Sequence, residues 1–183
     1  MPWDHLDLPN ASVRLFRGFL KPTESRPLMA KLLADISWRQ DTLRLYGRTV
    51  KVPRLHQWYS ATGHTYSWSS ITMEPAQMIE PLAAVMKHVA SATATDYQGV
   101  LANLYRTGDD SVSWHADDET DLGENPVIAS LSLGATRDFM LRSGTRKMTL
   151  ALRDGDLLVM EGETQKHWEH ALPKRKRCTE PRI

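Results

Sequence analysis

The stretch Ser113-Trp114-His115-Ala116-Asp117-Asp118-Glu119 is the part of the chain around which the remaining sequence can be organised. In a β-strand, side chains two residues apart point to the same face. His115 and Asp117 can therefore direct an imidazole nitrogen and a carboxylate oxygen to one point. Further along, His167-Trp168-Glu169-His170 can supply a second imidazole. The sequence thus predicts a metal site built from two histidines and one carboxylate.

Two imidazoles and one carboxylate on one face of a metal leave its other positions open. This arrangement suits a non-haem Fe(II) oxygenase, in which O2 and a co-substrate both bind the iron. By itself the pattern is weak, because the chain has seven His residues and short motifs arise by chance. The alternative is a surface histidine beside acidic loop residues, with His170 as an ordinary half-buried side chain.

Polar residues on either side of the metal motif supply the groups that a dicarboxylate co-substrate needs. A buried carboxylate requires a cation and hydrogen-bond donors. Asn103 and Tyr105 lie upstream of the motif, and Arg182 lies beyond the last histidine. These three residues are suited to hold 2-oxoglutarate.

Together these motifs resemble those of the AlkB-type Fe(II)/2-oxoglutarate-dependent nucleic-acid demethylases, and most closely the branch of the third human AlkB homologue. The resemblance covers most of the chain and is specific. It rests on residues 52–55, 58–59, 71–75, 103–106, 110–112, 114–115, 117–119, 128–132, 134–137, 160–162, 170 and 180–182.

The spacing of short apolar segments between turn residues independently favours a sandwich or a jelly roll, and the resemblance implies the jelly roll. Helices are expected to begin near Pro22 and Pro81, because apolar residues recur at helical spacing after each, and a hairpin with a turn at Gly47 is expected between them. Further strands are expected at 13–16, 100–105, 126–133, 139–142, 148–152 and 157–160. We therefore expect an α+β chain that is mainly β, with a double-stranded β-helix and two supporting helices.

We expect one catalytic domain over residues 1–183. Residues 1–97 would form an N-terminal extension with the helices and a nucleotide-recognition lid, and residues 98–183 would form the jelly-roll core. In the family, the pattern continues past the position of Arg182 into a short strand that ends in a second Arg. The core is therefore expected to be truncated before its final strand, which puts half of the co-substrate clamp in doubt.

The resemblance implies that 2-oxoglutarate is oxidised to succinate and CO2 while an N-methyl group on a base is hydroxylated and leaves as formaldehyde. Fe(II) would be bound by His115, Asp117 and His170, and O2 would be the second co-substrate. Arg182 and Tyr105 would hold the far carboxylate of 2-oxoglutarate. Asn103 would place the end that chelates iron.

The resemblance also implies a base-binding site. Trp68 and His115 would hold the base between their rings, and Glu119 would accept a hydrogen bond from an exocyclic amino group. Aromatic residues in 54–70 could instead pack at a strand edge. Aromatic faces stack on bases of any sequence, and the resemblance favours a base-binding lid. Secondary contacts to the base or the backbone would come from Tyr66, Tyr59 and Arg54.

The expected substrates are 1-methyladenine and 3-methylcytosine in DNA or RNA. We expect a preference for single strands, because residues 60–64 contain none of the apolar side chains that usually intercalate. Two other classes stay open. One is an Fe(II)/2-oxoglutarate hydroxylase of a protein or small molecule, and the other is a catalytically silent jelly-roll binding protein.

Composition excludes several classes of protein. The net charge of +1 gives no general affinity for phosphate, so phosphate contacts must be local. The basic run at 174–177 is one candidate, although such runs are often solvated surface. No apolar run approaches a membrane span, and the N-terminus lacks signal-peptide character. Cys178 is the only cysteine, which fits a reducing compartment. We therefore expect a cytoplasmic protein, or a nuclear or cytoplasmic one in a eukaryote. We also expect a monomer that does not contact a membrane.

Overall fold

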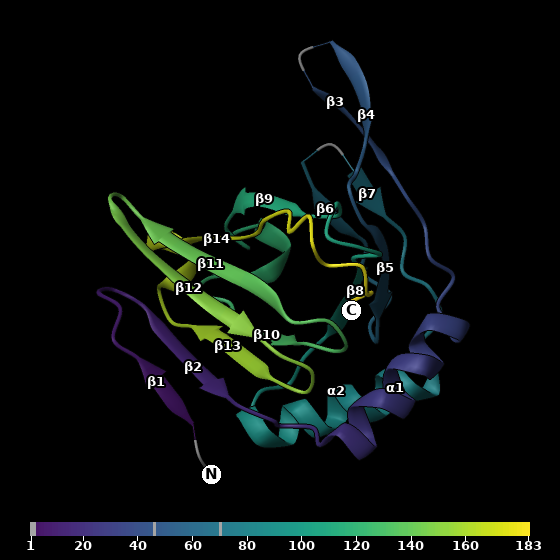
Figure 1. Cartoon of the computed structure of the whole chain (residues 1–183), viewed down its shortest axis with the longest axis horizontal. Helices are drawn as coiled ribbons and strands as arrows, with labels where there is room; N and C mark the ends of the chain where they lie inside the picture. Colours follow the sequence, from purple (N-terminus) through teal and green to yellow (C-terminus); the bar gives the residue numbers. More distant parts are fainter. Residues whose placement is uncertain (1–2, 46, 70) are drawn as a thin grey trace.

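Two four-stranded antiparallel sheets form the centre of the computed structural model, which describes residues 3–45, 47–69 and 71–183 (Figure 1). The sheets have the strand orders β1-β2-β13-β10 and β12-β11-β14-β9, which agrees with the predicted jelly roll. The first contains β1 (Asp4–Leu6), β2 (Ser12–Phe16), β13 (Leu157–Glu161) and β10 (Ile128–Leu131). The second contains β12 (Arg146–Leu152), β11 (Arg137–Ser143), β14 (Glu169–Leu172) and β9 (Val112–His115).

Strand β13 shows how alternation builds the core between the sheets. Leu158 and Met160 belong to an apolar cluster with residues of β2, β11 and β12. Leu157 and Val159 point the other way and pack with Val89 of helix α2 (Glu80–Thr93). The strand is therefore buried on both faces, as its continuous apolar run predicted. Strands β1 and β2, which come from the predicted N-terminal extension, complete this sheet by pairing with each other and with β13.

Helices α1 (Pro22–Asp35) and α2 lie on one side of the sheets (Figure 1). Both predicted helices are confirmed, and each has proline in its first turn, where the fixed φ of proline suits a helix. Leu32 and Ile36 pack into a cluster with residues of α2, β5 (Leu55–Ser60) and β8 (Gly99–Leu104). Leu33, the residue after Leu32, is 36% exposed. Neither helix, nor any other in the described ranges, is long and apolar enough to cross a membrane.

The predicted hairpin is present as β3 (Thr42–Leu45) and β4 (Arg48–Lys51), and it projects from the body as an arm (Figure 1). Gly47 at its turn has a φ of 76°, a conformation that glycine adopts without a steric penalty. Near the base of this arm, β6 (Tyr66–Trp68) pairs with β7 (Ile71–Met73). Strand β5 pairs with β8 in a separate two-stranded sheet.

Arg182 and Ile183 lie between the ends of two strands. Arg182 forms antiparallel bridges with Tyr105, directly after β8, and with Gly134, shortly after β10. Ile183 exchanges two backbone hydrogen bonds with Leu133, of 2.9 and 3.0 Å. These bonds hold Arg182 in an extended conformation between the two strands.

Candidate metal centre

His115, Asp117 and His170 converge, with ligand atoms that all lie within 4.8 Å of one another. The Asp117 carboxylate places Oδ1 3.7 Å from His115 Nε2 and Oδ2 3.4 Å from His170 Nε2. The two histidines are direct partners in the register between β9 and β14, and their ring centroids are 4.2 Å apart. The predicted triad is therefore confirmed. The alternative imidazole, His167, is exposed and lies 3.7 Å from Glu163 instead.

Asp117 reaches the centre differently from the prediction. Strand β9 ends at His115, so strand alternation does not extend to Asp117. Its backbone N–H instead donates a hydrogen bond to Gln165 Oε1 at 2.9 Å. Gln165 belongs to the one-turn helix α3 (Thr164–His167), and sequence reasoning missed it. No local pattern reveals that this turn packs against the loop after β9.

Local contacts prepare the ligands for a metal. His115 Nδ1 lies 2.8 Å from the Ser113 carbonyl oxygen, which can only accept, so the proton resides on Nδ1 and Nε2 is left to bind a metal. Burial, with a contribution from the nearby His115, lowers the pKa of His170 to about 3, which keeps that ring neutral. Burial raises the pKa of the Asp117 carboxyl, because desolvation disfavours the charged form. A divalent cation would offset that penalty, so the donor set fits Fe(II).

Arg182 is the buried cation predicted for a co-substrate carboxylate. It is 4% exposed, and its guanidinium donates to the Leu152 carbonyl oxygen at 3.2 Å and to Ser132 Oγ at 2.7 Å. Burial lowers its pKa to about 10, which still leaves it charged at neutral pH. Across the described ranges, none of the ion pairs includes Arg182. A buried cation without a counter-ion is costly, so the site fits an anionic ligand.

Tyr105 lies in the same positively charged region. Burial raises the pKa of its hydroxyl, and the charges of Arg54, Arg182 and Arg137 oppose that rise. Arg137 is 1% exposed and donates to three backbone carbonyls, with its guanidinium 5.9 Å from the Tyr105 ring centroid. It was not predicted as a site residue. These three hydrogen bonds hold the Arg137 guanidinium beside the Tyr105 ring.

Asn103, Arg54 and Trp68 form one connected group. Arg54 Nε donates to Asn103 Oδ1 at 2.8 Å, and the Arg54 guanidinium lies 4.9 Å from the centroid of the Trp68 ring. His56, which is fully buried, approaches Trp68 edge-on at 5.9 Å between centroids. Its Nε2 lies 2.8 Å from Asp41 Oδ2. His56 and Asp41 were not foreseen, and they connect the base of the β3–β4 arm to Trp68.

Tyr66 and Glu119 lie close together. Tyr66 stacks on Trp58 with ring centroids 4.9 Å apart, and burial together with the charge of Glu119 raises the pKa of its hydroxyl. Burial also raises the pKa of the Glu119 carboxyl. Glu119 Oε2 is buried and has no hydrogen-bond partner among the residues that the structure describes. This oxygen can therefore accept a hydrogen bond from a ligand.

Tyr59 does not join the site, which corrects its prediction as a base-contacting residue. It is 2% exposed and packs in the core with Leu32 and Leu82 of the two helices. Alternation along β5 explains the difference, since neighbouring residues point to opposite faces. Trp58 faces the cavity, so Tyr59 faces the helices.

A cavity of about 1590 Å³ brings the remaining residues together. It is lined by the three metal ligands and by every other predicted site residue except Tyr59. Ordinary small-ligand pockets have volumes of about 300–1,000 Å³. The cavity therefore has room for more than one small ligand beside the metal centre.

Comparisons with known proteins agree with this geometry. A protein-family model described as the 2OG-Fe(II) oxygenase superfamily matches residues 12–183. The human alpha-ketoglutarate-dependent dioxygenase alkB homolog 3 is 38% identical over 93% of this chain and 63% of that protein. The mouse DNA oxidative demethylase ALKBH2 is 36% identical over 99% of this chain and 81% of that protein. The chain thus spans less than two thirds of the length of the human homolog 3 protein.

A solved structure also shares the fold. The structure of OsALKBH1 matches with a TM-score of 0.61 at 18% identity, and the match covers 94% of this chain and 88% of that chain. At this level of identity the likeness extends to the fold alone. Together with the family match, it confirms the double-stranded β-helix.

Proposed function

Because this chain belongs to the AlkB family of 2OG-Fe(II) oxygenases, we propose that it removes methyl groups from alkylated nucleic-acid bases by oxidation. The observation that carries the proposal is one cavity that contains the metal triad, a buried cation without a counter-ion and a tryptophan. The expected substrates are 1-methyladenine and 3-methylcytosine in DNA or RNA. A base-sized ligand and a dicarboxylate would both fit this cavity beside the metal.

Each residue of the centre has a defined task in this proposal. Fe(II), O2 and 2-oxoglutarate would supply the oxidising chemistry that hydroxylates the N-methyl group and yields formaldehyde, succinate and CO2. His115, Asp117 and His170 would hold the metal, and a set of only three protein ligands suits a metal that must also bind O2 and a co-substrate. Arg182 neutralises the far carboxylate of 2-oxoglutarate with Tyr105 beside it.

Asn103 completes the co-substrate site in this proposal. Its Oδ1 is already engaged by Arg54, so the amide that remains is a donor. A donor suits the carboxylate end of 2-oxoglutarate that chelates iron. Asn103 therefore links the co-substrate to the group that holds Trp68.

The base would lie between Trp68 and His115. Arg54 lies over one face of the Trp68 indole, and the opposite face would stack on the base. The free Oε2 of Glu119 suits the exocyclic amino group of adenine or cytosine, because a carboxylate only accepts. Tyr66 stands beside Glu119 and limits the width of the pocket.

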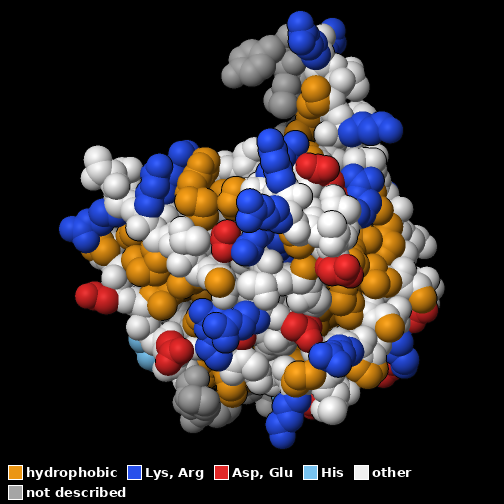
Figure 2. Space-filling model, viewed as in Figure 1, with side chains coloured by type: hydrophobic (Ala, Val, Ile, Leu, Met, Phe, Trp, Pro, Cys, Tyr) orange, Lys and Arg blue, Asp and Glu red, His pale blue; other side chains and the backbone are white. Residues whose placement is uncertain are grey.

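Phosphate contacts would come from local basic groups, since the chain as a whole is nearly neutral. Figure 2 shows Lys and Arg side chains on the projecting β3–β4 arm. Arg44, Arg48 and Lys51 of this arm are exposed. The run at 174–177 is also exposed. Such placed cations hold a strand without reading its sequence.

Mass spectrometry of methylated oligonucleotides tests the proposal. The protein is incubated with Fe(II), 2-oxoglutarate and a strand carrying 1-methyladenine or 3-methylcytosine, and we expect loss of the methyl group with formation of succinate. Asp117→Ala is the inactive control. Succinate formation that methylated strands do not stimulate would favour a protein or small-molecule hydroxylase. No succinate under any condition would favour a silent binding protein.

A further inference from the structure

The Asp117 carboxylate is held in the triad by a residue that is not itself a ligand. We propose that Gln165 is a positioning residue of the metal centre, and that it fixes the backbone of Asp117 so that the carboxylate meets the two imidazoles. The proposal concerns metal binding alone. It therefore holds whichever substrate the enzyme oxidises.

The contact is short and partly buried, and it joins residues that are far apart in the sequence. Asp117 N–H donates to Gln165 Oε1 at 2.9 Å, and Gln165 is only 4% exposed. The other end of the amide, Nε2, lies 3.7 Å from Met160 Sδ in the core. The side chain is thus held at both ends and presents its oxygen to the loop.

The segment that carries Gln165 is fixed independently of the metal. Thr164 Oγ1 accepts from Ser12 N–H at 2.9 Å and donates to the Glu161 carbonyl oxygen at 2.6 Å. Trp168 Nε1 donates to the Pro9 carbonyl oxygen at 2.9 Å. The chain then enters β14, which carries the ligand His170. Through Gln165, one anchored segment therefore positions two of the three ligands.

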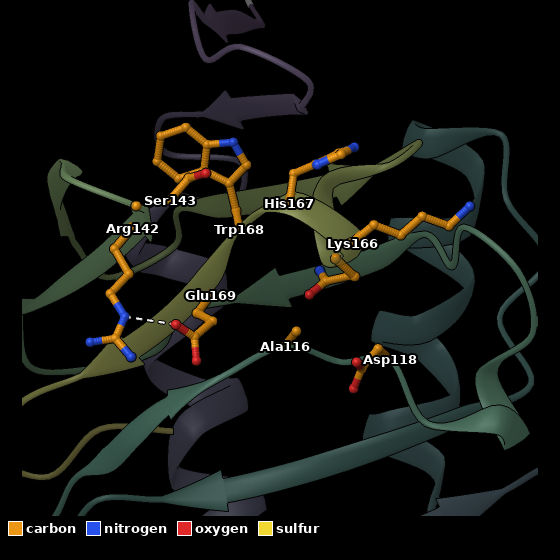
Figure 3. Close-up of a pocket in the computed structure, with 10 residues that line it drawn as sticks. Ala116, Asp118, Arg142, Ser143, Lys166, His167, Trp168 and Glu169 are labelled. Atoms are coloured by element: carbon orange, nitrogen blue, oxygen red, sulfur yellow. Dashed lines mark hydrogen bonds and ion pairs between the residues drawn. The ribbon is translucent and has the colours of Figure 1, made fainter.

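Hydrogen bonding between this loop and α3 is sparse. Figure 3 shows Ala116 and Asp118, which flank Asp117, across a surface pocket from Lys166 and His167. This pocket, of about 310 Å³, is lined both by the loop and by α3. Within the described chain, the bond to Gln165 is the only hydrogen bond between residues 116–119 and α3. Without it, the carboxylate would not be held in place before the metal arrives.

Metal titration of two substitutions separates positioning from packing. Gln165→Met keeps the length and volume of the side chain but removes the acceptor, whereas Gln165→Glu keeps an acceptor oxygen. Groups that orient metal ligands typically change metal affinity by about 10–100-fold when they are removed. With Co(II) as the probe, in the absence of 2-oxoglutarate, we expect a loss of that size for Gln165→Met. We expect wild-type or tighter binding for Gln165→Glu.

Gln57→Met is the matched control. Gln57 is also buried, at 8% exposed, but among the described residues its side chain makes one hydrogen bond, to the neighbouring Trp58 carbonyl oxygen at 3.4 Å. We expect it to leave Co(II) affinity unchanged. Melting curves of the metal-free proteins show whether each variant is folded.

Three results would overturn the proposal. The first is wild-type Co(II) affinity in folded Gln165→Met, and the second is an equal loss in Gln57→Met. The third is a loss of about 10–100-fold in folded Gln165→Glu, and this measurement remains decisive if the Met variant fails to fold. Failure of demethylation with normal Co(II) binding would count against the proposed substrate and not against the role of Gln165.

Discussion

Arg182 is a buried guanidinium whose two hydrogen bonds go to neutral oxygens. We expect Arg182→Lys to raise the KM for 2-oxoglutarate, because a planar fork becomes a single ammonium. A charged hydrogen bond contributes about 1.5–3 kcal/mol, so the rise should be about 10–100-fold. Steady-state succinate formation measures it. The exposed Arg153, replaced by Lys, is the control. An unchanged KM for Arg182→Lys would place the clamp elsewhere.

Asp117 belongs to the candidate metal triad, and its side chain keeps 18% exposure. We expect Asp117→Ala to abolish Co(II) binding and turnover. The metal-free variant should melt no lower than the wild type, because the substitution removes a carboxyl whose pKa is raised by burial. Metal titration and thermal melting measure these two effects. Retained turnover would remove Asp117 from the triad.

Trp68 belongs to the proposed base site and is not one of the metal ligands, so its substitution tests base binding separately from metal binding. We expect Trp68→Ala to weaken demethylation by the loss of about 1–3 kcal/mol of base stacking. Turnover of 2-oxoglutarate in the absence of nucleic acid should change little, because Arg182 and the triad are intact. Trp3→Ala, which alters an aromatic pair with Phe16, is the control. An equal loss in both reactions would mean that Trp68 supports the fold and not the base.

At the scale of elements, the facing strands β8 and β10 offer a place for one more strand. Among the described strands, β8 pairs only with β5, and β10 pairs only with β13. Arg182 and Ile183 already bridge the ends of both. We expect an extended segment of alternating apolar residues, added after Ile183, to hydrogen-bond both strands. It should raise the melting temperature and lower the KM for 2-oxoglutarate, because Arg182 is then held from both sides.

The control for that experiment is an added segment of equal length that contains proline. Proline cannot donate to a β-ladder, so this version should give neither effect. Equal gains from both segments would show that added length, and not strand pairing, is responsible.

Sequence patterns predicted elements better than they predicted contacts. Helices α1 and α2, the β3–β4 hairpin and the doubly buried β13 follow from periodicity and turn residues. The triad was predicted too, but strand alternation does not explain the position of Asp117, because β9 ends at His115. Gln165 was missed because its role depends on how α3 meets a distant loop. Tyr59 was wrongly predicted to contact the base, because the face of β5 that turns toward the cavity depends on how this strand packs against the two helices.

At the scale of the whole molecule, charge and shape together constrain the substrate. The net charge is +1, so binding to nucleic acid, as proposed, would depend on the few basic groups around the cavity and on the arm. Contacts of this kind release counter-ions and weaken steeply with salt. They do not distinguish a single strand from a duplex by sequence, so the form of the substrate would be decided by the base that must enter the cavity.

A base in a duplex must be unstacked before it can reach Trp68, which costs a few kcal/mol. Residues 61–64 are exposed and contain no apolar side chain of the intercalating kind. We therefore expect faster repair of a single strand, by a factor of roughly 10², since each 1.4 kcal/mol is tenfold. The assay compares one 1-methyladenine oligonucleotide alone and annealed to its complement. Equal or faster repair of the duplex would contradict this prediction. It would direct attention to Val50 on the arm, which is 37% exposed and borders the cavity.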